Sequence, residues 1–216
     1  MKQQLSGFRK VGGYCAVASG ILFLIRGILD FLSGPPPSSG SEILSWAASH
    51  SLLIAFQDEA TFFAAILLVP ALAVLYRAVR GEHRLAAVAG SGITATAIPI
   101  LMSLVIVQGR LVYPVFGINV NSPGIAEFVV ALFYGGLHAV DIIIGIGAFV
   151  LGFSMRGEPH GRLIVALAVL IGLIDIVGAY PYIIGPVGTL ICQMFFSLWF
   201  IVLGSILLSS APKTER

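Results

Sequence analysis

Long runs of apolar residues, separated by short polar segments, dominate the chain. Six of these runs are long enough to cross a bilayer: approximately 12–33, 52–76, 85–108, 125–152, 163–180 and 187–209. A helix needs about 20 apolar residues to cross about 30 Å of hydrocarbon. Backbone groups in lipid must form hydrogen bonds within their own segment, so each run is expected to be a helix. The pattern predicts an all-α integral membrane protein, a single domain over 1–216 built as a six-helix transmembrane bundle.

The distribution of basic residues predicts the orientation of this bundle. Almost all lysines and arginines lie at the two termini or in the loops after the second and fourth spans: Lys2, Arg9, Lys10, Arg77, Arg80, Arg84, Arg156, Arg162, Lys213 and Arg216. An even number of crossings places all of these segments on one side. By the positive-inside rule, both termini are expected to be cytoplasmic (N-in/C-in) in a multi-pass protein of the cell membrane.

The segments on the opposite side contain helix breakers and interfacial residues. The stretch SGPPPSSGSE (33–42) cannot continue a helix, because its prolines lack N–H donors and fix φ. ILSWAASH (43–50) predicts a short interfacial helix with Trp46 at the level of the lipid head groups. Ser122 followed by Pro123 predicts the start of the fourth span. YPYIIGP (180–186) predicts a tight outer turn.

Composition supports a lipid environment and excludes several classes of function. The chain is 58% hydrophobic and only 10% charged, whereas soluble domains carry about 25% charged residues. A net charge of +2, with no basic tract interleaved with aromatics, excludes a nucleic-acid partner. Cys15 and Cys192 lie in apolar runs and form no C-x-x-C motif, so neither a thiol redox motif nor a zinc knuckle is indicated.

Charged residues inside the predicted spans are the candidate functional residues. An ionised carboxylate in hydrocarbon costs at least about 2.5 kcal/mol, so these side chains are expected to face the bundle interior. Most of them belong to the outer half of the membrane, which predicts a polar cavity that opens outward. The candidate ligand-binding residues are Arg26, Asp30, Asp58, Glu59, Arg110, His138, Asp141 and Asp175.

Helical spacing indicates how some of these residues pair. Arg26 and Asp30 are four residues apart on one helix, so we expect an intrahelical ion pair. Asp175 is expected to accept a hydrogen bond from Tyr134 or Gln193 across a helix interface. Structural pairing of this kind is the alternative to a functional role for each buried charge.

One group of these residues has the composition of a metal site. His138 and Asp141 are one helical turn apart and point the same way. With Asp58 and Glu59 they offer one nitrogen and several oxygens, a set that suits zinc or another divalent ion. A metal-activated water in the outer half of the membrane would hydrolyse a lipid amide or ester. The single histidine within the spans and the lack of an H-E-x-x-H motif weaken this hypothesis.

Binding of a small ligand, ion or lipid head group in the outward-facing cavity is the function that we favour from the sequence. A metal-dependent membrane hydrolase is the first alternative, and a proton- or cation-coupled transporter is the second, because intramembrane carboxylates serve as proton relays. An accessory subunit of a larger membrane complex is the third. The expected partners are the lipid bilayer, a small molecule or lipid, and a second copy or a membrane complex.

Several segments also resemble a known family. They are RKVGGYCAVASGILFLI (9–25) in the first span, the LH pair in the fourth, a short loop with glycine and arginine, and LIGLIDIVGAY (170–180) in the fifth. This pattern looks like an uncharacterised family of bacterial six-span membrane proteins, filed as a domain of unknown function. The resemblance covers most of the chain in loose pattern, and Asp58–Glu59 does not match it. It implies six spans and no established activity.

Overall fold

The computed structural model describes residues 2–78, 83–157 and 161–209 of the chain. Within these ranges the chain forms helices and no β-strand. Six of the helices are long and apolar enough to cross a membrane, which confirms the predicted all-α six-helix bundle of a multi-pass membrane protein. The helices are α1 (Lys2–Ser33), α2 (Gly40–Ser49), α3 (Ser51–Ala78), α4 (Arg84–Gly109), α5 (Pro123–Ser154), α6 (Gly161–Gly178) and α7 (Pro181–Ser209).

Helix bounds follow the predicted spans closely except at two ends. α5 starts at Pro123, with Ser122 at its N-cap position, as the sequence predicts. α1 begins at Lys2, well before the apolar run, because a helix can continue beyond the hydrocarbon into water. The predicted outer turn at 180–186 is shorter than expected, since helix resumes at Pro181. Gly185 then breaks α7 with φ 72° and ψ 175°, directly before Pro186.

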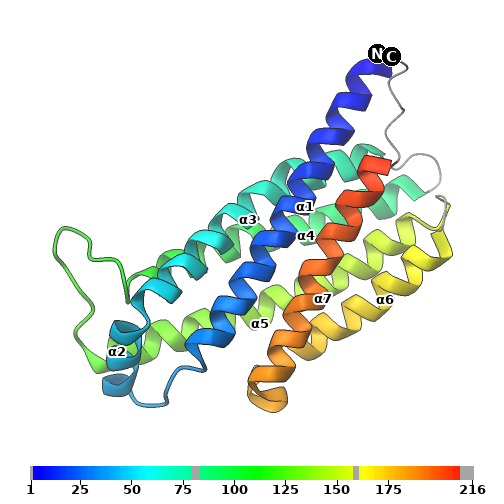
Figure 1. Cartoon of the computed structure of the whole chain (residues 1–216). Coiled ribbons are helices and arrows are strands. Elements are labelled where there is room, and N and C mark those ends of the chain that lie inside the picture. The colour runs from blue at the N-terminus through cyan, green and yellow to red at the C-terminus, as the bar shows by residue number, and fades with distance from the viewer. Residues whose placement is uncertain (1, 79–82, 158–160, 210–216) are drawn as a thin grey trace.

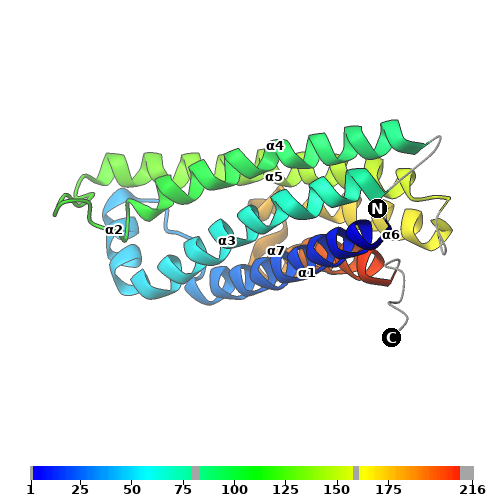
Figure 2. The ribbon, with the colours of Figure 1, turned by 90° about the horizontal axis from the view of Figure 1, so that it is seen from above.

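The six long helices form a closed ring. Around it each helix packs on the next in the order α1, α3, α4, α5, α6, α7, and α7 returns to α1. Figures 1 and 2 show this elongated bundle, with the start of α1 and the end of α7 at one end. We call the opposite end, which carries α2 and the loop 110–122, the outer end. The N-in/C-in orientation relative to the cell stays a prediction, and Arg80, Lys213 and Arg216 lie outside the described residues.

Helix α2 covers the outer end and forms hydrogen bonds with α1 and α5. The Trp46 indole Nε1 donates to the carbonyl oxygen of Ser33, the last residue of α1, at 2.9 Å. The backbone N–H of Gly40, the first residue of α2, donates to Glu127 Oε1 of α5 at 2.7 Å. The short helix is confirmed, and the placement of Trp46 at the level of the head groups stays a prediction. Its ring is buried against Ala47 and its indole is used to satisfy a helix end.

Glycines set the close approach of α1 and α7. Gly13, Gly20 and Gly27 recur every seven residues and so lie along one side of α1. A Cβ on Gly20 would lie 2.7 Å from the Ser197 carbonyl oxygen, and one on Gly27 would lie 2.5 Å from Gln193 Oε1. Small residues let membrane helices pack at short range. Here they bring the polar face of α7 against α1.

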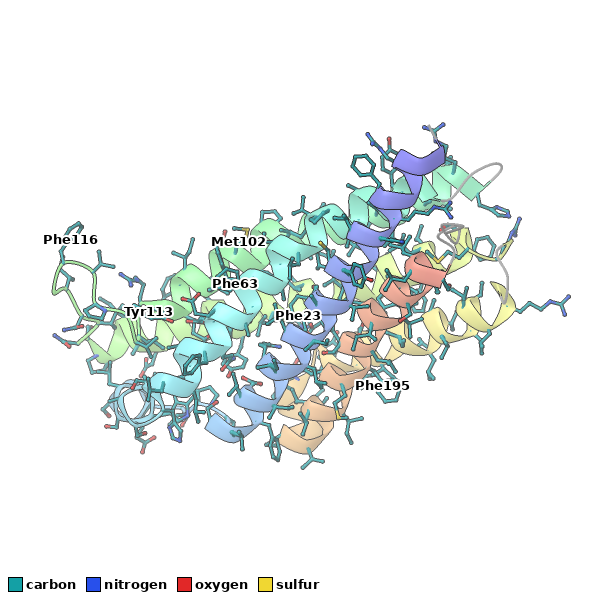
Figure 3. The ribbon with its side chains drawn as sticks, turned by 45° about the horizontal axis from the view of Figure 1, so that its top comes forward. Phe23, Phe63, Met102, Tyr113, Phe116 and Phe195 are labelled. Atoms are coloured by element: carbon teal, nitrogen blue, oxygen red, sulfur yellow. The ribbon has the colours of Figure 1, made fainter. Side chains whose placement is uncertain are left out.

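The side chains divide the bundle into an apolar interior and a polar outer half. Phe23 is 3% exposed and lies inside the bundle, in a cluster that includes Leu68 and Leu203 (Figure 3). Phe116, at the tip of the loop 110–122, is fully exposed and points away from the helices (Figure 3). The buried charged side chains lie toward the outer ends of their helices, whereas the partly buried Asp141 lies near the middle of α5.

We predict that Gly20→Leu destabilises the bundle, because its side chain would meet the backbone of α7. Overpacking of this kind costs about 1–3 kcal/mol of unfolding free energy. Gly135→Leu is the matched control, since a Cβ at that position of α5 meets nothing within 4 Å. Unfolding by SDS in mixed micelles measures both variants. Equal stability of the two would contradict the close α1–α7 contact.

Candidate functional site

The carboxylate of Asp30, near the outer end of α1, joins four helices. Gln57 Nε2 of α3 donates to Asp30 Oδ1 at 3.1 Å, and the Tyr134 hydroxyl of α5 donates to the same oxygen at 3.4 Å. Gln193 Nε2 of α7 donates to Asp30 Oδ2 at 3.4 Å. We call these four residues the Asp30 cluster. All three donors are neutral, so they hold the carboxylate in place without neutralising its charge.

The expected ion pair between Arg26 and Asp30 is not found among the described residues, so that prediction is wrong. The carboxylate of Asp30 is engaged by donors from other helices instead. The guanidinium Nε and Nη2 of Arg26 are buried and have no hydrogen-bond partner in the described part of the chain. Arg26 is only 9% exposed. A buried cation without a hydrogen-bonding partner is costly and calls for an explanation.

A small cavity lined by both charged and apolar side chains lies beside the Asp30 cluster, inside the ring of six helices. Its volume is about 40 Å³, which is room for a few water molecules. Five of the eight predicted ligand-binding residues line it: Arg26, Asp30, His138, Asp141 and Asp175. The structure therefore brings together charged residues that are far apart in the sequence.

A larger groove extends from this cavity toward the outer end. Its volume is about 500 Å³ and its lining is mostly apolar, including Phe31, Val130 and Leu190. Asp30, Tyr134, Pro181, Thr189 and Gln193 line both the groove and the cavity. The two spaces therefore meet at the Asp30 cluster. The apolar groove lies on the side of the outer end, and the cavity with its charged residues lies on the side of the bundle interior.

His138 is fixed by the end of a neighbouring helix. Its Nδ1 lies 2.7 Å from the carbonyl oxygen of Ala179, just after α6 ends. A carbonyl only accepts, so Nδ1 carries the hydrogen and Nε2 is the nitrogen left for other partners. The ring also makes an edge-to-face contact with Tyr180, with centroids 4.9 Å apart. This pairing orients the imidazole and satisfies one of the free carbonyls of α6.

Two acids approach each other across the α5–α6 interface. Asp141 is close enough to Arg26, His138 and Asp30 to interact with their charges. Asp175 interacts with the charge of Asp141, is 2% exposed, and has no hydrogen-bond partner for either oxygen among the described residues.

Asp175 does not make the hydrogen bond that the sequence predicts. The two expected donors, Tyr134 and Gln193, bind Asp30 instead. The register of α5 and α7 therefore directs both donors to α1, and the carboxylate of Asp175 in α6 is left facing the cavity without a donor.

Three of the predicted residues lie outside the cavity. Asp58 is 1% exposed, its two oxygens lack a partner in the described residues, and it faces Gly109 of α4. The neighbouring Glu59 points elsewhere and accepts from the Tyr113 hydroxyl at 3.3 Å. Burial, together with the charges of Glu59 and Asp58, raises the pKa of Tyr113 above its ordinary value of 10.0. Arg110 donates to the Tyr113 carbonyl oxygen in the outer loop.

The expected metal-ligand set does not form. In the part of the chain that the structure describes, no group of three or more His, Cys, Asp or Glu side chains is arranged to hold a metal ion. His138 and Asp141 line the cavity, whereas Asp58 and Glu59 face α4 and the outer loop. Adjacent residues on a helix point about 100° apart. Asp58 and Glu59 therefore cannot both face the cavity, and neither of them does.

The neutral members of the Asp30 cluster are not among the site residues that the sequence predicts. Gln57 was not considered, and Tyr134 and Gln193 were assigned to Asp175. A side-chain amide inside an apolar span is the signal that would have indicated Gln57 and Gln193. Thr189, where groove and cavity meet, carries no such signal, because threonine often bonds to its own helix, as it does here to Gly185.

Comparisons with known proteins leave the site to be interpreted from its own chemistry. No family model, curated protein or solved structure matches the chain. The resemblance to the uncharacterised six-span family stays a prediction. A fold does not by itself imply a function, so the function must be argued from the residues of the site.

We predict that Asp30→Ala destabilises the bundle by about 2 kcal/mol or more, because one buried and two partly buried donors would lose their shared acceptor. SDS titration in mixed micelles measures the free energy of unfolding. Glu42→Ala, which removes an exposed carboxylate from α2, is the control and is expected to leave the free energy of unfolding unchanged. Equal stability of the two variants would show that the Asp30 cluster does not hold the helices.

Proposed function

We propose that the protein binds a small amphiphilic ligand or a lipid, with its head group in the small cavity and its apolar part in the groove. The observation that carries this proposal is a pair of buried side chains, Arg26 and Asp175, on the wall of one cavity, whose polar atoms have no hydrogen-bond partner among the described residues. Buried polar groups are nearly always hydrogen-bonded, and exceptions call for an unseen partner. A ligand that enters through the groove would supply that partner.

The shape of the two spaces supports an amphiphile over a free ion. Ligand pockets in proteins are typically about 300–1,000 Å³, mostly apolar, with a few convergent polar groups. The groove has this size, and its polar residues Asp30, Tyr134 and Gln193 lie at its inner end. An ion alone would occupy the cavity and leave the groove without a role.

The rim of the groove also suits a ligand that comes from the membrane. Prolines 35–37 keep the segment after α1 out of a regular helix, and the break at Gly185 and Pro186 does the same in α7. Irregular backbone at membrane depth is tolerated where it lines a cavity. Residues of both interruptions line the groove.

The alternatives from the sequence have weaker support. Metal-dependent hydrolysis is not proposed, because the expected ligands are not gathered. Proton- or cation-coupled transport and an accessory role stay predictions, since no charged side chain is buried in the inner half of the described bundle.

We predict that at least one of three amphiphiles with an octyl chain binds in the groove: 2-aminodecanoic acid, nonylamine or decanoic acid. Binding is measured as a rise in melting temperature of the protein in nanodiscs. Ala131→Trp fills the groove and is expected to abolish the rise. Ala139→Trp, two turns further along α5 at an exposed position off the groove, is expected to retain it.

The comparison of the two tryptophan variants separates binding at a specific site from partition of the compound into the bilayer. A rise that Ala131→Trp and Ala139→Trp reduce equally would indicate partition and contradict the proposal. No rise with any of the three compounds would contradict it as well. The test does not depend on which head group is preferred.

A further inference from the structure

The cavity is lined by a basic and an acidic side chain whose polar atoms lack hydrogen-bond partners in the described part of the chain. Arg26 belongs to α1 and Asp175 to α6, and these two helices flank α7 on its two sides. Both side chains line the cavity, and no ion pair joins them in the described part of the chain. Two charges left apart in a low-dielectric site are costly unless something placed between them compensates both.

The free atoms of Arg26 fit an acid group. Nε and Nη2 form the side-on fork of a guanidinium, which binds the two oxygens of a carboxylate or phosphate together. Arg26 is close enough to Asp58 and Asp141 to interact with their charges, but neither accepts a hydrogen bond from Nε or Nη2. Asp30 is already engaged by three donors. The fork therefore lacks an acceptor among the described residues.

The free atoms of Asp175 fit an ammonium group. Both carboxylate oxygens lack donors, and the charge that acts on Asp175 is that of another acid, Asp141. An ammonium has three donors and would interact with both carboxylates at once. Gly145 lets α5 approach α6 closely beside Asp175, because a Cβ there would lie 2.9 Å from the Gly172 carbonyl oxygen.

We propose that the head group of the ligand is zwitterionic, with an acid group on Arg26 and an ammonium on Asp175. This inference rests on the proposed function. A purely cationic head would leave the Arg26 fork without an acceptor, and a purely anionic head would leave Asp175 without a donor. The cavity of about 40 Å³ requires that the two charges lie on a compact head, with the apolar chain in the groove.

Two sources carry this chemistry. An apolar amino acid has its ammonium and carboxylate on one carbon, and a zwitterionic phospholipid has an ammonium near its phosphate. Both combine an acid group, an ammonium and an apolar chain, the three parts for which Arg26, Asp175 and the groove offer partners. The shared chemistry is the proposal, and the experiment distinguishes the sources.

The three octyl compounds differ only in the head group. In nanodiscs of phosphatidylglycerol, the wild-type protein is expected to bind 2-aminodecanoic acid about tenfold or more tighter than nonylamine or decanoic acid. The reason is that the zwitterionic head makes one more charge-assisted hydrogen-bonded contact than either singly charged head. Arg26→Gln is expected to reduce the preference over nonylamine, and Asp175→Asn the preference over decanoic acid. Glu59→Gln, which lies outside the cavity, is expected to keep both preferences.

The outcomes separate this inference from the proposed function. Tightest binding of nonylamine or of decanoic acid, or equal binding of all three, would overturn the zwitterionic head and leave ligand binding intact. Absence of any binding would overturn the proposed function itself. The wild-type comparison needs no variant, so a misfolded Arg26→Gln protein does not obscure the result.

A second arm identifies the source of the ligand. Nanodiscs that contain phosphatidylethanolamine are compared with nanodiscs of phosphatidylglycerol alone. If the ligand is a zwitterionic lipid, phosphatidylethanolamine competes and raises the apparent dissociation constant of 2-aminodecanoic acid by about tenfold or more. If the ligand is a free amino acid, the dissociation constant is the same in both membranes. Either result supports the zwitterionic head and assigns its source.

Discussion

The carboxylate of Asp30 is the interaction on which the outer half of the bundle depends. It lies in α1 and accepts hydrogen bonds from α3, α5 and α7, of which only α3 and α7 are its neighbours in the ring. The bond from Tyr134 therefore crosses the ring. In hydrocarbon, polar groups find their partners within the protein, so one acid with three donors fixes the register of four helices at once.

This cluster also divides two different environments. On the side of the outer end, the groove is mostly apolar and is lined in part by prolines. On the side of the bundle interior, charged residues line the cavity. An amphiphile has the same order of parts along its length. Arg26 and Asp175, left without partners by the helix register, are the groups that a head group would satisfy. The same carboxylate thus serves the packing of the helices and the boundary of the site.

The sequence predicted the helices better than the pairing of their side chains. Apolar runs and the Ser122–Pro123 start report on single segments, and these predictions are confirmed with small shifts at Lys2 and Pro181. Five cavity residues were also expected, because charges avoid lipid. The hydrogen-bond partners of these residues were not predicted correctly, since the rotation of each helix decides whether Tyr134 and Gln193 contact Asp30 or Asp175. Local spacing does not encode that rotation.

Access from the outer end tests the account most directly. In a Cys15→Ser, Cys192→Ser background, Thr189→Cys places one thiol where groove and cavity meet. The account predicts modification by a membrane-impermeant methanethiosulfonate reagent added outside intact cells. Thr94→Cys, buried between α4 and α5, is the unreactive control. A thiol at 189 that stays as unreactive as that at 94, or reacts only from the cytoplasmic side of inverted vesicles, would contradict an outward-facing site.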